Sequence, residues 1–96
     1  MLTGNINDLI VYDRIKKQQL YKEDRFHVML LSMQQGEFLK PHQSNSDAFL
    51  TVLEGEIIFT KDEIDHKLLK GDMFTFKASE KHSVKALQNA SLLIVK

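Results

Sequence analysis

The chain has 96 residues, a formal net charge of zero at pH 7 and no cysteine. This length corresponds to one domain, because single cores typically occupy about 100 to 150 residues. Without a basic excess the chain lacks the signature of a general nucleic-acid binder or of a membrane-surface protein, and without cysteine it can form neither a disulfide nor a thiolate zinc site. No signal pattern opens the chain and no apolar run reaches the roughly 20 residues of a membrane span, so we expect a soluble cytoplasmic protein with no nucleic-acid or membrane partner.

The first residues of the chain leave two structures open. Residues 5–11 can form one helical turn, capped by Asn5 or Asn7, or a short strand. From Ile15 the pattern favours β-structure, and the lysines of residues 15–21 are typical of an edge strand, where they discourage pairing with another sheet. We therefore treat residues 1–14 as an N-terminal extension.

The rest of the chain predicts short β-strands separated by turns. The expected strands are residues 15–21, 26–34, 48–53, 56–61, 65–69, 73–77, 82–87 and 91–95. Residues 36–42 are expected to form a strand end and then a turn that carries His42. About eight short strands, with turn signals every 8 to 12 residues or so, are typical of an all-β sandwich or barrel. No linker interrupts the pattern, so we expect a single domain over residues 1–96 with its core from about residue 15.

Several of these strands are apolar on both faces. An antiparallel strand with one exposed face alternates apolar and polar residues, but residues 29–31, 48–53, 57–59 and 92–95 do not. No helix is expected to cover the second face. A partner subunit is the simplest cover, so the sequence predicts a homodimer.

Two stretches resemble the two conserved motifs of the cupin family, which are small double-stranded β-helix (jelly-roll) barrels. Gly36 opens the first stretch, His42 takes the family's first histidine position, and Gly55 closes it. The second stretch runs from Gly71 through a short apolar strand to His82, at the family's spacing. The resemblance covers roughly half of the chain and implies an all-β jelly-roll barrel of the cupin type.

Cupins typically hold a divalent metal with three histidines and one glutamate that point into the barrel. In this chain Ser44 stands at the second histidine position and Ala48 at the glutamate position. The resemblance therefore implies a degenerate metal site, in which His42 and His82 hold either no cofactor or a weakly bound divalent metal. Asp47 could complete a set of two histidines and one carboxylate, although its strand parity, opposite to that of Ala48, favours a role in capping the turn or a place on the outer face.

Strand phase predicts an apolar lumen around the two histidines. Side chains alternate across a strand, so if His42 points into the barrel, Leu50 and its even-numbered neighbours on the same strand do so too. The two phenylalanines of residues 73–77 share one face and either line the pocket or pack in the core. The expected pocket residues are His42, Ser44, Ala48, Leu50, Val52, Phe74, Phe76 and His82. Among them Ser44 is the candidate to hold a water or a substrate hydroxyl.

These features leave different functions open. We favour a module that binds a small organic ligand in a largely apolar pocket, where His42 and His82 contact a polar group of the ligand. The resemblance implies an alternative, a metal-dependent enzyme of the dioxygenase or isomerase type, in which a non-standard third ligand joins the two histidines. A metal-free enzyme with a histidine as general base is a third possibility, and it requires an orienting carboxylate that the sequence does not identify.

Overall fold

The computed structural model describes residues 1–96 and confirms the all-β prediction. Its elements are η1 (Ile6–Asp8), β1 (Ile15–Lys22), β2 (His27–Met33), β3 (Phe38–His42), β4 (Ala48–Glu54), β5 (Glu56–Lys61), β6 (Ile64–Leu69), β7 (Met73–Phe76), β8 (His82–Ala86) and β9 (Ala90–Val95). The strands form a five-stranded sheet in the order β1-β2-β9-β4-β7 and a four-stranded sheet in the order β3-β8-β5-β6. All strand pairs are antiparallel.

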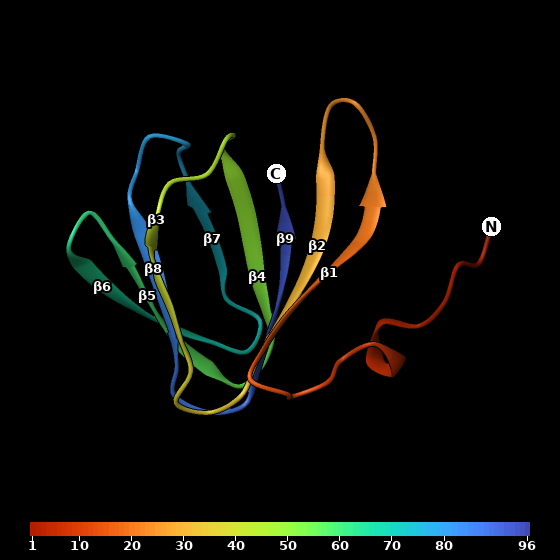
Figure 1. The fold of residues 1–96 in the computed structure, drawn as a ribbon, viewed down its shortest axis with the longest axis horizontal. Coiled ribbons are helices and arrows are strands. Elements are labelled where there is room, and N and C mark those ends of the chain that lie inside the picture. Colours follow the sequence, from red (N-terminus) through yellow and green to blue (C-terminus); the bar gives the residue numbers. More distant parts are fainter.

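The two sheets face each other as the halves of a jelly-roll barrel (Figure 1). They converge at one end and diverge at the other, where the β3–β4 loop, the β7–β8 loop and the C-terminus lie. We call this the open end of the barrel.

The N-terminal extension contains a single turn of 3-10 helix, which decides between the two structures expected for it. The side chain of Asn5 accepts a hydrogen bond from the N–H of Asn7 at 2.9 Å and caps the turn. The hydroxyl of Tyr12 then donates to Glu54 at 2.9 Å and ties the extension to the end of β4. No helix of the chain has the length and apolar character needed to cross a membrane.

The prediction for residues 36–42 was wrong in part. Residues 38–42 form strand β3, so the structure has nine strands, and His42 is the last residue of a strand rather than part of a turn. Pro41 lies inside this strand, where the pairing with β8 shifts register between Leu39 and His42. Proline has no N–H to donate, but β3 is an edge of its sheet and an edge strand tolerates that loss.

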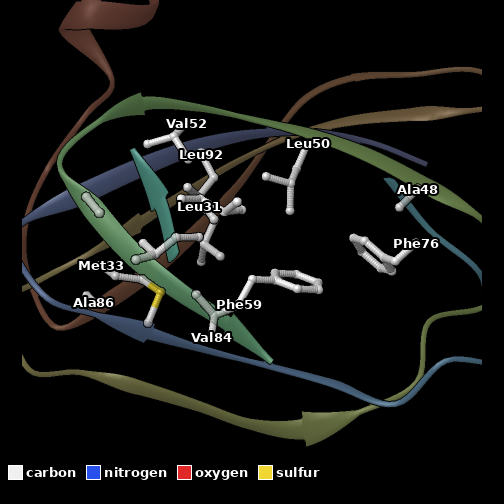
Figure 2. Close-up of a cluster of buried hydrophobic side chains, with 13 residues drawn as sticks. Leu31, Met33, Ala48, Leu50, Val52, Phe59, Phe76, Val84, Ala86 and Leu92 are labelled. Atoms are coloured by element: carbon white, nitrogen blue, oxygen red, sulfur yellow. The ribbon is translucent and has the colours of Figure 1, made fainter. Parts of the chain in front are cut away.

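The core lies between the sheets and is built from the inward-facing residues of both (Figure 2). Ala48, Leu50 and Val52 on β4 are 6%, 1% and 1% exposed, so they share the inner face as the strand phase predicts. Phe59 on β5 is 1% exposed, and its ring centroid lies 4.8 Å from that of Phe74.

The outer faces of the two sheets differ in charge. On the four-stranded sheet, cross-strand neighbours such as Lys85, Ile58 and Lys67 mix charged and apolar residues. On the five-stranded sheet, the strand registers place only uncharged residues on the outer face of β2, β9, β4 and β7 before that face ends at Glu54. We call the accessible members of this set the neutral face: Val28, Phe49, Thr51, Met73, Thr75, Leu93 and Val95. Leu30, Ser32 and Ser91 have the same strand parity but are fully buried within the chain.

Candidate ligand-binding site

The structure brings the two predicted histidines together at the open end of the barrel. His42 ends β3 and His82 begins β8, and the two residues are direct partners in the strand register. Their ring centroids lie 4.3 Å apart in an edge-to-face arrangement. His42 is exposed, whereas only 5% of His82 is exposed, so the pair extends from the surface into the core.

Backbone carbonyl groups orient both imidazole rings. Nδ1 of His42 lies 2.8 Å from the carbonyl oxygen of Lys40, and Nδ1 of His82 lies 3.1 Å from that of Glu80. Because a carbonyl oxygen only accepts hydrogen bonds, each Nδ1 carries the proton and donates. In the neutral form of each ring, Nε2 then keeps its lone pair and is available to accept a hydrogen bond from another molecule.

His82 is held in an aromatic environment. Its ring stacks on Phe59 at a centroid distance of 5.5 Å and an interplanar angle of 8°, and it lies 4.3 Å from the ring of Phe76. Burial lowers the pKa of His82, and the hydrogen bond to Glu80 opposes this effect. The positive charges of His42 and Lys96 lower the pKa further, so the neutral, accepting form is favoured.

The loops beside the histidines are joined by hydrogen bonds. Gln43 on the β3–β4 loop donates to the carbonyl oxygen of Ser79 on the β7–β8 loop at 2.9 Å. Asp47 accepts from the N–H of Ala78 at 3.0 Å, and this bond lowers the pKa of the Asp47 carboxyl. Asp47 therefore connects its own loop to the β7–β8 loop. These bonds hold the two loops together where they border the open end.

A cavity of about 70 Å³ opens between the sheets beside the two histidines. Ten of its fifteen lining residues are hydrophobic. Five of the eight residues expected in the pocket line it, namely His42, Ser44, Leu50, Phe76 and His82. We call this space the barrel cavity. The Ser44 hydroxyl donates to the carbonyl oxygen of Ser46 at 2.6 Å, so it already has a partner within its own loop.

The other three residues expected in the pocket belong to the core instead. Val52 is fully buried in the core cluster and does not line the cavity. Ala48 has a short side chain and lies beside its larger register partner Phe76, which forms the wall in its place. Phe74 packs against Phe59 and against His66, with centroid distances of 4.8 and 4.9 Å. Parity places all three on the inner face, but it does not give their depth.

Sequence reasoning missed two basic residues of the cavity wall, Lys17 on β1 and Lys96 after β9. The sequence places Lys17 on an edge strand, where a lysine discourages pairing with another sheet. A parity count along β9 could have found Lys96, because it follows Leu92 and Ile94 at spacings of two. Finding Lys17 also requires the register of β1 on β2, in which it pairs with the core residue Leu31.

The fold and this site can be compared with known proteins. The sequence model described as a cupin domain matches residues 29–96 of the chain. The chain belongs to the cupin family. None of the curated proteins matches this cupin in sequence.

Solved structures agree with the family assignment. An RmlC-like cupin protein from Desulfovibrio desulfuricans superposes with a TM-score of 0.88 at 22% identity, covering 99% of this chain and 94% of that one. KdgF from Halomonas superposes with a TM-score of 0.79 at 22% identity, covering 97% and 91%. A cupin 2 conserved barrel domain protein from Leptotrichia buccalis gives 0.88 at 26% identity, and the match covers 96% of this chain but 46% of that one. The fold is therefore that of a cupin barrel.

The donor set of this cupin does not fit the site of three histidines and one glutamate that is typical of cupins. The structure contains no group of three or more His, Cys, Asp or Glu side chains that could hold a metal ion. The carboxylate of Asp47 is bound by Ala78 and lies 3.4 Å from the ammonium of Lys77, so it does not complete a set with the histidines. Two imidazoles are one donor short of the three protein ligands that catalytic transition-metal sites usually have.

The lowered pKa of His82 predicts how stability changes with pH. In an unfolded chain histidine titrates near a pKa of about 6.5. Because the folded pKa is lower, the unfolded chain binds more protons once the pH falls below that value. We expect full stability above about pH 6.5 and a loss as the pH falls from there through the folded pKa. Urea unfolding at several values between about pH 7 and pH 5 measures this slope.

The variant His82→Phe keeps a ring in the same place but cannot titrate, so its slope over this range should be flatter. The variant His27→Phe, at a histidine outside the cavity, is the control and should keep the wild-type slope. Equal slopes in the wild-type protein and in His82→Phe would show that His82 is not the group responsible.

Proposed function

We propose that this cupin binds a small organic ligand in the barrel cavity and that the imidazoles of His42 and His82 provide the acceptor for a hydrogen-bond donor of the ligand. The observation that carries the proposal is the pair of oriented imidazoles in an otherwise largely apolar wall. A pocket with apolar walls and a few fixed polar groups is the usual form of a small-molecule site.

The tautomers of the two rings indicate which group the ligand presents. With each Nδ1 bonded to a carbonyl oxygen, a neutral ring offers only the lone pair of Nε2. The group that meets it must donate a hydrogen bond, as a hydroxyl does. The apolar remainder of the ligand would contact Leu50, Phe76 and Val84, which line the same cavity.

The size of the cavity restricts the ligand. A volume of about 70 Å³ holds roughly five water-sized groups, at 10–15 Å³ for each. Drug-sized ligands occupy pockets of roughly 300–1,000 Å³. The proposal therefore concerns a molecule with a short carbon chain.

The test uses 1-butanol, which combines such a chain with one hydroxyl donor. We expect titration with 1-butanol to shift the backbone amide NMR signals of cavity residues such as Leu50 and Val84. The hydroxyl of 1-butanol has one proton and bonds one imidazole at a time, so the double variant His42→Ala/His82→Phe is needed to remove both acceptors. It should weaken binding by about 2- to 10-fold, the range of one hydrogen bond. His42→Ala alone should change the stability little, because His42 is exposed.

The variant His27→Ala removes a histidine outside the cavity and is the matched control. Binding should also be unchanged by EDTA, because the donor set does not support a firmly held metal. Shifts spread over the surface, or no shifts at all, would contradict ligand binding in the cavity. Loss of binding on addition of EDTA would instead support the metal-dependent alternative.

We also propose that the protein forms a homodimer through the neutral face of the five-stranded sheet. This face has half-buried apolar residues such as Phe49, Leu93 and Val95, and Met73 at its edge is 71% exposed. The residues of this face are uncharged, and the charged Lys16 and Glu54 lie at its borders, so two copies can pack together through it without burying an unpaired charge. The charged outer face of the other sheet lacks this property. A cytoplasmic location stays a prediction from the sequence.

A further inference from the structure

Every ionisable side chain that lines the barrel cavity is basic. The four are Lys17, His42, His82 and Lys96, and no aspartate or glutamate lines the cavity. In the chain as a whole, acidic and basic residues are equal in number, 13 of each. The cavity wall is therefore basic, whereas the chain as a whole is neutral.

The two lysines lie on the opposite sheet from the two histidines. Lys17 belongs to β1 and is paired with Leu31, a core residue, so both point to the inner face of the five-stranded sheet. Lys96 follows Ile94 by two residues, and its N–H donates to the carbonyl oxygen of His27 at 2.9 Å, which keeps it in line with β2. The histidines stand on β3 and β8 of the four-stranded sheet. A ligand in the cavity would thus have lysines on one side and histidines on the other.

Neither of these lysines forms an ion pair within the chain. The ion pairs of the structure use three other lysines, Lys61, Lys67 and Lys77, at 3.3 to 3.6 Å from their carboxylate partners. Lys17 and Lys96 have no carboxylate oxygen within 4.0 Å. The positive charge of Lys96 acts on the histidine side of the cavity, because it contributes to the lowered pKa of His82.

We propose that the ligand of the barrel cavity is a small hydroxycarboxylate, whose carboxylate is bound by Lys17 and Lys96. The inference rests on the proposed function, which places the hydroxyl of the ligand on the histidine side of the cavity, where its one proton bonds the Nε2 of one imidazole. A carboxylate complements two unpaired ammonium groups, and charged hydrogen bonds are stronger than neutral ones. A cationic ligand would meet four basic residues and no acidic one.

Three probes that differ at one end separate charge from shape. 4-Hydroxybutyrate, 1-butanol and 4-amino-1-butanol share a four-carbon chain and a hydroxyl, and they end in a carboxylate, a methyl and an ammonium group. Titrations followed by amide NMR signals of cavity residues give the three affinities. We expect 4-hydroxybutyrate to bind roughly 5- to 20-fold more tightly than 1-butanol, and 4-amino-1-butanol to bind least. Added salt should weaken only the binding of 4-hydroxybutyrate.

The variants Lys17→Met and Lys96→Met remove the charge and keep most of the side-chain length. Each should reduce the affinity for 4-hydroxybutyrate towards that for 1-butanol. Lys85→Met, on the outer face of the four-stranded sheet, is the matched control and should change neither affinity.

The outcomes distinguish this inference from the proposed function. If 1-butanol and 4-hydroxybutyrate bind equally well, the cavity binds ligands but the assignment of a carboxylate is wrong. If 4-hydroxybutyrate binds more tightly and Lys85→Met weakens it as much as Lys17→Met does, the carboxylate is not held in the cavity, and the inference again fails. If no probe shifts the cavity signals, the proposed function fails and the inference fails with it.

Discussion

Replacing Gly55 by alanine is expected to lower the free energy of unfolding by about 3 kcal/mol or more. Gly55 joins β4 to β5 with a φ of +79°, in the region that residues with a side chain rarely adopt. A Cβ at this position would overlap the carbonyl oxygen of Asn89 and lie 2.9 Å from the Cα of Ala90. Both neighbours are backbone atoms, so the start of β9 would have to move away from the turn.

Gly71→Ala is the matched control for this prediction. Gly71 also has a positive φ, of +88°, but no atom lies within 4 Å of the position where its Cβ would stand. The free energy of unfolding of Gly71→Ala should therefore fall only by the cost of a positive φ at alanine, about 1 to 2 kcal/mol. Urea unfolding of the two variants measures the difference. Equal losses would mean that the contact with Asn89 is relieved at little cost.

Introducing a charge on the neutral face is expected to dissociate the proposed homodimer. Leu93 lies in the middle of this face, between Leu30 on β2 and Thr51 on β4. In Leu93→Glu the dimer would bury a carboxylate without a partner, which costs several kcal/mol, so we expect the dimer dissociation constant to rise on the order of a hundredfold. Sedimentation equilibrium over a range of protein concentrations measures it.

The control is Ile58→Glu on the other sheet. Ile58 is half-buried like Leu93 but lies between Lys85 and Lys67 on the charged outer face. This variant should remain dimeric, and circular dichroism should show that both variants are folded. A wild-type protein that is monomeric at every concentration would contradict the proposed homodimer. Dissociation by Ile58→Glu alone would show that the interface lies on the four-stranded sheet.

The strand pattern of this cupin could be predicted because strands and tight turns are marked by residues that are neighbours in the sequence. Alternation and apolar runs mark the strands, and the two-residue turn at Asp62 and Glu63, both with positive φ, connects β5 to β6 as a tight hairpin does. The exception is residues 38–42. Pro41 is a turn signal in a sequence, but in the structure it lies on a sheet edge where no partner needs its N–H.

The sequence by itself determined the all-β fold, the frame that places His42 and His82, and the loss of two expected metal ligands to Ser44 and Ala48. Each of these depends on residue type and on spacing along the chain. Only the tertiary structure decided which residues surround the cavity. Lys17 is 79 residues from Lys96 in the numbering of the chain, and the two share one cavity because both β1 and β9 pair with β2. Such register between distant strands, and the depth of each side chain below the open end, are set by packing across the two sheets.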